Sequence, residues 1–193
     1  MANDVWLKER MRAGQDRVSD AAGADGRVSV CVRTLKTPVG VLRVAASEDS
    51  VVSIELPRRR SEPALERWLR SHIPHSAETP VLRAALAQLR EYFAGKRRCF
   101  DVPADPAGTE FQRRVWSAVA AIPFGETTSY GTIAAALGGM QRARAVGAAV
   151  GANPIPIVIP CHRVVGADGS LTGYGGGLRM KVWLLRHEGV LLA

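Results

Sequence analysis

The hydrophobic pattern of the chain changes near residue 28. Residues 1–27 are polar and charged with scattered larger apolar side chains, which predicts a flexible tail rather than a docked helix. From Val28 apolar residues alternate with polar or small ones, as in a half-buried strand, and segments 41–46 and 51–56 predict two more strands. A turn at 37–40 joins the first two strands, so we expect a small antiparallel sheet.

Helical spacing replaces this alternation in the next part of the chain. A long helix is predicted from Pro80 to Gly95, because proline favours the first turn of a helix and glycine its end. The apolar face of this helix comprises Val81, Leu82, Ala85, Leu86, Leu89, Tyr92 and Phe93. A shorter helix is expected around Trp68, after an exposed arginine run at 58–60, and segment 101–108 is typical of an interdomain linker.

The second half of the chain is predicted to be mostly helical. Residues 109–112 form a capping-box pattern, and the helix that they start ends at Pro123. Its buried residues are expected to be Phe111, Val115, Val119 and Ile122. Thr128 or Ser129 then caps a short helix that ends at two glycines, and another helix follows over about residues 141–151. Two short helices joined by a glycine turn have the outline of a helix-turn-helix.

The second helix of this pair consists almost entirely of small residues with one arginine, Arg144. Glycine destabilises a helix, so these glycines indicate either close packing against another helix or the close approach of another molecule. A helix that reads base edges in the major groove projects several long polar side chains, which this helix lacks. This helix instead fits a binding mode in which it enters the minor groove of DNA without reading the base sequence, and Arg144 is inserted as a wedge.

Composition narrows the class of protein. The chain of 193 residues has 26 Lys+Arg against 18 Asp+Glu, and this excess favours a polyanionic partner, nucleic acid first. Its three cysteines predict no disulfide framework and suit a reducing compartment. Neither a signal peptide nor a membrane span is predicted, so we expect a cytoplasmic protein. His72 and His75 have no further ligands nearby, so no metal site is predicted.

The most informative motif is Pro160-Cys161-His162-Arg163, which follows a proline-spaced apolar segment. Prolines fix φ and remove backbone donors, so residues 153–160 cannot form a helix or a central strand. They are predicted as a stiff extended segment that presents Cys161. A thiol near an imidazole is a candidate nucleophile, and a buried cysteine that only packs is the alternative.

An acidic residue stands where a helix would disfavour it. Residues 178–189 predict a last helix with Gly189 as its C-terminal cap, and Glu188 lies at this end. The helix dipole disfavours a negative charge there. We therefore expect a specific partner to hold the Glu188 carboxylate.

Several motifs of the chain occur together in one family. In chain order they are Gly108-Thr109-Glu110-Phe111-Gln112, Ser129-Tyr130, Arg144-Ala145-Val146-Gly147, Asn153-Pro154, Pro160-Cys161-His162-Arg163-Val164, Gly173-Tyr174 and His187-Glu188-Gly189. Over about residues 28–193 the sequence resembles the O6-alkylguanine-DNA alkyltransferases, also called methylated-DNA–protein-cysteine methyltransferases. The resemblance implies an α/β amino-terminal domain at 28–106, with a small antiparallel sheet and helices. A mainly α carboxy-terminal domain with a winged-helix-like helix-turn-helix would follow at 107–193.

The resemblance also implies roles for individual residues. Cys161 matches the alkyl-accepting nucleophile, His162 the base that activates it through a bridging water, and Glu188 the group that orients His162. Asn153 matches the residue that braces the turn before the cysteine, and Tyr130 the donor to the flipped guanine. The residues that would contact DNA are Arg144, as the finger that fills the vacated stack, with Ala143, Gly147, Ala148, Gly151, Thr128 and Ser129. The walls of the base pocket would be Pro156, Val164, Tyr174 and Gly175.

The implied function is direct reversal of DNA damage. The alkyl group of a flipped O6-methylguanine would move irreversibly to Cys161, once per molecule and without a cofactor. The implied partner is double-stranded DNA, bound through the minor groove by a monomer, and the sequence leaves cooperative binding open. One departure from the family pattern is Gly139-Met140-Gln141, which replaces an expected proline-containing turn.

Three other functions fit the sequence less well. A non-catalytic sensor of alkylated DNA would lack the acceptor cysteine, which is present at Cys161. A thiol hydrolase would use Cys161 and His162 but give no role to Arg144 or to the basic excess. A sequence-reading transcription factor would leave Cys161, Tyr130 and Glu188 idle. Direct repair is therefore the function that the sequence favours.

Overall fold

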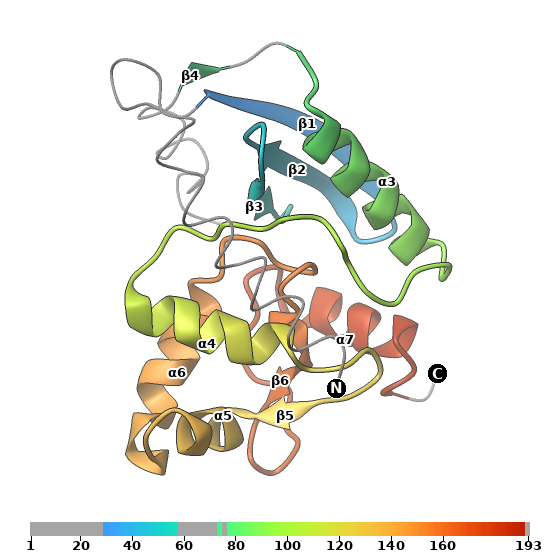
Figure 1. Ribbon diagram of the computed structural model, residues 1–193. Helices are drawn as coiled ribbons and strands as arrows, with labels where there is room; N and C mark the ends of the chain where they lie inside the picture. The colour runs from blue at the N-terminus through green and yellow to red at the C-terminus, as the bar shows by residue number, and fades with distance from the viewer. Residues whose placement is uncertain (1–28, 58–72, 75–76, 192–193) are drawn as a thin grey trace. The chain divides into compact units, whose positions relative to one another are not determined.

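The structure is a computed structural model that describes residues 29–57, 73–74 and 77–191 (Figure 1). The predicted tail at 1–27, the arginine run at 58–60, the helix around Trp68 and the histidines at 72 and 75 lie outside these ranges. The described residues divide into two compact units, and the boundary along the chain lies between Pro106 and Ala107.

The first unit contains a sheet of four strands, β1 (Ser29–Thr37), β2 (Gly40–Ala46), β3 (Val51–Glu55) and β4 (Ile73–Pro74). The strands lie in the order β3-β2-β1-β4. Pairing of β1 with β2 and of β2 with β3 is antiparallel, which confirms the predicted small sheet. The parallel strand β4 was not predicted, because two residues carry no readable alternation.

Helix α3 (Pro80–Phe93) packs against β1 and β2 (Figure 1). Thr79 caps its first turn, and the hydroxyl oxygen of Thr79 accepts a hydrogen bond from the Leu82 amide at 3.1 Å. Leu82, Leu89 and Tyr92 are fully buried, so the predicted helix and its apolar face are confirmed. Thus the first unit has the expected α/β architecture.

The segment predicted as an interdomain linker belongs partly to this sheet. The amide of Val51 donates to the carbonyl of Pro103 at 2.8 Å, and the amide of Asp105 donates to the carbonyl of Val51 at 2.9 Å. Val102 and Ala104 are buried. The linker prediction for 101–108 is therefore wrong for residues 102–105. Prolines exclude a central strand, but a short bridge at the exposed edge of β3 needs few amide donors.

The second unit is mainly helical, as predicted. Its helices are α4 (Glu110–Ala120), α5 (Tyr130–Ala136), α6 (Ala143–Gly151) and α7 (Leu178–His187), with a short 3-10 turn at Met140–Arg142 before α6. The capping box of α4 is present, because the Gln112 amide donates to the Thr109 hydroxyl at 3.2 Å and the Thr109 amide donates to the Gln112 side chain at 2.8 Å. Of the two predicted caps for α5, Ser129 is the one used.

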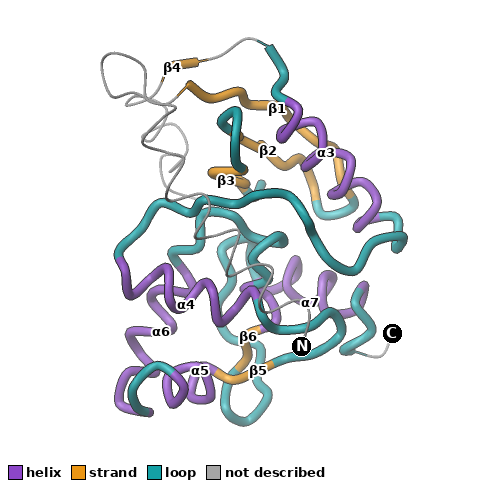
Figure 2. Tube along the Cα trace, viewed as in Figure 1, coloured by secondary structure: helices purple, strands orange, loops and turns teal. Residues whose placement is uncertain are grey.

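Two very short strands in this unit were not predicted. Strand β5 (Thr128–Ser129) pairs in parallel with β6 (Val164–Val165), and both strands are labelled in Figures 1 and 2. Because β5 leads directly into α5 and β6 follows the turn at Cys161, this pair ties the helix-turn-helix to the reactive segment. Within the described ranges, no helix is long and apolar enough to cross a membrane.

Candidate active site

The segment that leads to Cys161 reverses direction instead of running straight. The Ile159 amide donates to the Ile155 carbonyl at 2.9 Å, and Pro156 forms a bridge with Ile159. Ile157 has a φ of 77°, the left-handed region that β-branched residues rarely adopt. The predicted stiff extended wall is therefore wrong. The prolines exclude a helix as expected, but proline also favours turns, and the sequence pattern does not separate the two outcomes.

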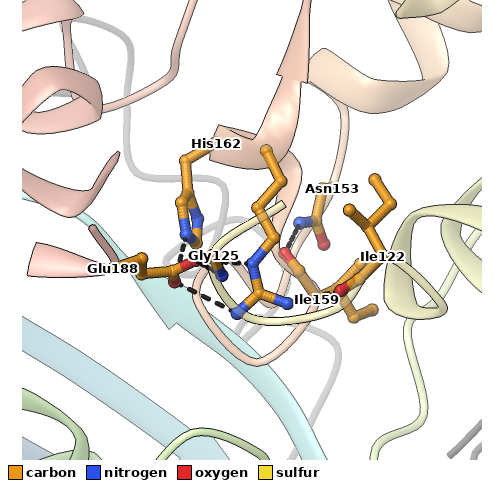
Figure 3. Close-up of polar contacts among 7 residues, drawn as sticks. Ile122, Gly125, Asn153, Ile159, His162 and Glu188 are labelled. Atoms are coloured by element: carbon orange, nitrogen blue, oxygen red, sulfur yellow. Dashed lines mark hydrogen bonds and ion pairs between the residues drawn. The ribbon is translucent and has the colours of Figure 1, made fainter. Parts of the chain in front are cut away.

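Asn153 holds both sides of this turn. Its side-chain amide donates to the Ile159 carbonyl at 2.8 Å (Figure 3). Its side-chain oxygen accepts from the Ile155 amide at 3.0 Å. The residue is 5% exposed, so water competes little for these bonds. The two bonds fix the backbone one residue before Pro160-Cys161. The bracing role that the resemblance implies for Asn153 has a clear structural basis.

Cys161 begins a 3-10 turn, Cys161–Arg163, that leads into β6. The Cys161 amide donates to the Ile159 carbonyl at 2.8 Å, which closes the reversal. The Cys161 residue is 9% exposed, and His162 is fully buried. A thiol at this depth is largely shielded from bulk water.

The Glu188 carboxylate is the centre of a buried polar network (Figure 3). Its Oε1 lies 2.7 Å from Nε2 of His162, and it accepts from Arg163 at 2.8 Å to Oε2 and 3.1 Å to Oε1. The Gly125 amide also donates to Oε2, at 3.4 Å. Burial alone would raise the pKa of the Glu188 carboxyl, but the hydrogen bonds from His162 and Arg163 outweigh it and lower that pKa to about 2. The predicted partner for this carboxylate is confirmed.

The ionised carboxylate fixes the hydrogen on the imidazole of His162. Since Glu188 can only accept, Nε2 of His162 carries the hydrogen and donates it. Burial lowers the pKa of His162, although the hydrogen bond and charge of Glu188 oppose the shift, so the ring is neutral near pH 7. Nδ1 then has a free lone pair, and no described residue donates a hydrogen bond to it. This nitrogen is equipped to accept a proton.

Arg163 is the residue of this network that the sequence analysis did not single out. Besides its bonds to Glu188, its guanidinium donates to the Ile122 carbonyl at 2.6 Å and lies 5.9 Å from the centre of the Phe124 ring. The Arg163 side chain is buried and its charge is balanced by Glu188. An arginine inside a buried apolar run is a signal of such a pairing, because buried charges are rarely left unpaired.

The other predicted site residues take different positions. The rings of Tyr174 and His162 are nearly perpendicular, with their centres 6.4 Å apart, so Tyr174 lies at the site. Pro156 and Val164 are buried, whereas Gly175 is exposed. Among the described residues, no hydrogen bond joins Tyr130 to Cys161, His162 or Glu188. Tyr130 instead begins α5, and a Cβ added at Gly147 of α6 would lie 3.8 Å from its ring.

The predicted DNA-binding helix presents one bare face. Arg144, Ala148 and Gly151 follow the helical repeat of α6 and are all exposed, while Val146, Ala149 and Val150 are buried. A Cβ at Gly151 would meet nothing within 4 Å. Among the described residues, packing against a neighbouring side chain therefore does not account for the glycine at position 151. Ala143 and Gly147 are half-buried at its margin, as are Thr128 and Ser129 at the start of α5.

Most of the chain matches two models of one family. They are "6-O-methylguanine DNA methyltransferase, ribonuclease-like domain" at residues 30–106 and "6-O-methylguanine DNA methyltransferase, DNA binding domain" at residues 110–190. The methylated-DNA–protein-cysteine methyltransferase of Mycolicibacterium paratuberculosis is 46% identical over 157 residues, 81% of this chain and 90% of that protein. This chain belongs to the 6-O-methylguanine DNA methyltransferases. The protein of the same name from Salmonella typhimurium is 46% identical over 164 residues, 82% of this chain and 95% of that protein.

Solved structures of this methyltransferase family agree with the fold. The crystal structure of Mycobacterium tuberculosis O6-methylguanine methyltransferase has a TM-score of 0.71 and 44% identity, over 82% of this chain and 92% of that one. Mycobacterium tuberculosis OGT in complex with DNA has a TM-score of 0.71 and 42% identity, over 83% of this chain and 92% of that one. The predicted family, fold class and methyltransferase activity on DNA are confirmed, and a non-catalytic sensor is not favoured.

Proposed function

We propose that this methyltransferase removes the alkyl group from O6-alkylguanine in duplex DNA by transferring it to Cys161, once per molecule. The observation that carries the proposal is the buried hydrogen bond of 2.7 Å between His162 and Glu188, beside the one cysteine that follows the braced turn. In this pair His162 is the base for the Cys161 thiol, and Glu188 fixes the orientation of His162. The reaction follows from these two groups and the properties of the leaving base.

Activation of the thiol is the first step. A free cysteine is only a few per cent ionised at neutral pH, yet the nucleophile is the thiolate. Nδ1 of His162 takes the thiol proton through one bridging water, since adjacent side chains in a turn do not readily meet directly. The ionised Glu188 carboxylate then stabilises the imidazolium that forms.

Transfer is a direct displacement at the alkyl carbon. A carbon–sulfur bond forms as the carbon–oxygen bond to guanine breaks, and the electron pair of that bond passes to O6 and into the ring. Tyr130 donates a hydrogen bond to the flipped base, which stabilises this developing charge. Tyr174, Pro156, Val164 and Gly175 surround the base. The product is a thioether that no group of the site can cleave, so each molecule reacts once.

DNA is engaged through the exposed face of α6. The small side chains at Ala148 and Gly151 allow the helix to lie in a minor groove, and Arg144 fills the stack that the extruded guanine leaves. Extrusion is required because O6 of a paired guanine is inaccessible inside the duplex. We infer that the protein does this as a monomer in the cytoplasm.

The test is incubation with a duplex that carries one O6-methylguanine, followed by mass analysis of the intact protein and its peptides. We expect a single methyl group on the Cys161 peptide, with the reaction saturating at one per protein. Cys161→Ser should bind the same duplex and gain nothing. Bound DNA with an unmodified Cys161 in the unchanged protein would overturn the proposal and its His162–Glu188 mechanism.

A further inference from the structure

A buried lysine lies next to the proposed active site without a part in the mechanism above. Lys181 is in the first half of α7, and its side chain is fully buried. Lysine is almost never fully buried unless its charge is compensated. Its ammonium donates to the carbonyls of Val164 at 2.6 Å and Thr172 at 2.9 Å. In the described part of the chain, no carboxylate forms an ion pair with it.

These two carbonyls come from both flanks of the site. Val164 begins β6, directly after the turn that contains Cys161, His162 and Arg163. Thr172 stands two residues before Tyr174, whose ring lies 6.4 Å from that of His162, centre to centre. One ammonium group therefore joins the backbone that follows the Cys161 turn to the segment that carries Tyr174.

The charges around Cys161 are unbalanced while it is a thiol. Arg163 and Lys181 carry two positive charges, Glu188 carries one negative charge, and His162 is neutral. Arg163 is already paired with Glu188, so the charge of Lys181 remains. Burial lowers the pKa of Lys181, and the negative charge of the Cys161 thiolate opposes that shift. Ionisation of Cys161 would place a negative charge beside Lys181, the one positive group of this cluster that no described carboxylate pairs with.

We propose that Lys181 is a positioning residue of the transfer reaction, which joins Val164 to Thr172 and supplies the positive charge that balances the Cys161 thiolate. This inference rests on the proposed function only in taking Cys161 as the nucleophile. The two groups then have different roles. His162 removes the proton from the Cys161 thiol, and Lys181 stabilises the thiolate that remains.

The experiment measures the rate at which Cys161 reacts with iodoacetamide as a function of pH, followed on the Cys161 peptide by mass analysis. Lys181→Met removes the charge and the donors, whereas Lys181→Arg keeps the charge. The matched control is Arg179→Met, which removes a positive charge from an exposed position on the same helix. Circular dichroism and the urea midpoint establish that each variant is folded.

We expect Lys181→Met to react about tenfold more slowly than the wild type at pH values below both thiol pKa values, as for an apparent thiol pKa raised by about one unit. Lys181→Arg should stay within about threefold of the wild type, because the charge persists. Arg179→Met should react at the wild-type rate. A folded Lys181→Met variant with the wild-type pH profile would overturn the proposed charge balance. A pH profile of Lys181→Arg shifted as far as that of Lys181→Met would also overturn it.

A second measurement needs no variant, in case the neutral side chain prevents folding. The pKa of the Lys181 ammonium is followed by NMR in the wild-type protein before and after complete reaction of Cys161 with iodoacetamide. Capping the sulfur removes the thiolate, so the Lys181 pKa should fall, and an unchanged value refutes the inference. Iodoacetamide requires neither DNA nor lesion, so a wild type that takes no methyl group from DNA would refute the proposed function and leave this result interpretable.

Discussion

At the scale of single residues, the site depends on one carboxylate that serves two neighbours in the sequence. Oε1 of Glu188 contacts His162, and both oxygens accept from Arg163. These buried, charge-assisted hydrogen bonds from His162 and Arg163 keep the Glu188 carboxylate ionised and fix its orientation. The fixed carboxylate in turn fixes the orientation of the His162 ring, which a base acting on the adjacent Cys161 requires.

This network predicts how stability depends on pH. Folding lowers the pKa of Glu188 from 4.5 to about 2, so its stabilisation is complete above pH 4.5 and is lost as the pH falls towards 2. The loss is about 3 kcal/mol for a shift of this size. The pKa of His162 is also lowered from 6.5 on folding, so the unfolded chain binds that proton first and stability begins to fall below pH 6.5. Urea unfolding at a series of pH values measures the combined contribution of Glu188 and His162 to the free energy of unfolding.

Glu188→Gln separates the two contributions. At neutral pH the variant should be less stable by about 3 to 5 kcal/mol, because the buried Arg163 loses its counter-ion. The difference from the wild type should narrow by about 3 kcal/mol between pH 5 and pH 2, since only the wild type loses the carboxylate there. Curves that stay parallel over this range would contradict the assigned role of Glu188.

The residues of the site were predictable to different degrees. The need for a partner at Glu188 follows from its place at a helix C-terminus, a local property. That Arg163 shares this carboxylate with His162, and that Lys181 is buried, depend on contacts between distant parts of the chain. Arg163 and Glu188 are 25 residues apart, and no local pattern records the pairing. The family resemblance supplied His162 and left Arg163 without a role.

At the scale of elements, the parts set by local chemistry were predicted well. The capping box at Thr109 and the serine cap at Ser129 use hydrogen bonds within one turn, and the proline that starts α3 has a fixed φ suited to a first turn. The β5–β6 pair was missed, because its two strands are more than 30 residues apart in the chain. The turn at 155–159 was missed although its hydrogen bonds are local, because proline is compatible with both an extended segment and a turn.

The exposed face of α6 gives a prediction for an element. Ala148→Glu places a negative charge and a longer side chain on that face without disturbing any packed neighbour. We expect the free energy of unfolding to change by no more than about 0.5 kcal/mol. DNA affinity should fall by about tenfold or more, since a carboxylate would oppose the phosphates in a narrow groove.

The matched control is Ala84→Glu, at an alanine of α3 that is also exposed. Both variants add the same charge to the chain, so a non-specific charge effect would weaken DNA binding in both. Fluorescence anisotropy with an undamaged duplex measures the affinity. Equal losses for Ala148→Glu and Ala84→Glu would remove α6 from the DNA interface.

At the scale of the whole molecule, a net charge of +8 over 193 residues favours contact with a polyanion. The logarithm of the DNA affinity should fall linearly with the logarithm of salt concentration, with a slope of about −0.9 for each phosphate neutralised. Titrations with Cys161→Ser avoid the chemical step. Lesion-containing and undamaged duplexes should share one slope, because extruding a base adds no phosphate contact. A steeper slope for the lesion duplex would contradict this account.

The distance along the chain between the base and its carboxylate has a consequence for synthesis. His162 and Glu188 are 26 residues apart, so a ribosome adding about 5 to 20 residues per second completes Cys161 and His162 roughly one to five seconds before Glu188. Until Glu188 has been made, the His162 imidazole has no carboxylate to orient it, and the Cys161 thiol has the modest reactivity of an unactivated cysteine. The pair that activates this single-use thiol is therefore completed only after helix α6 has been made.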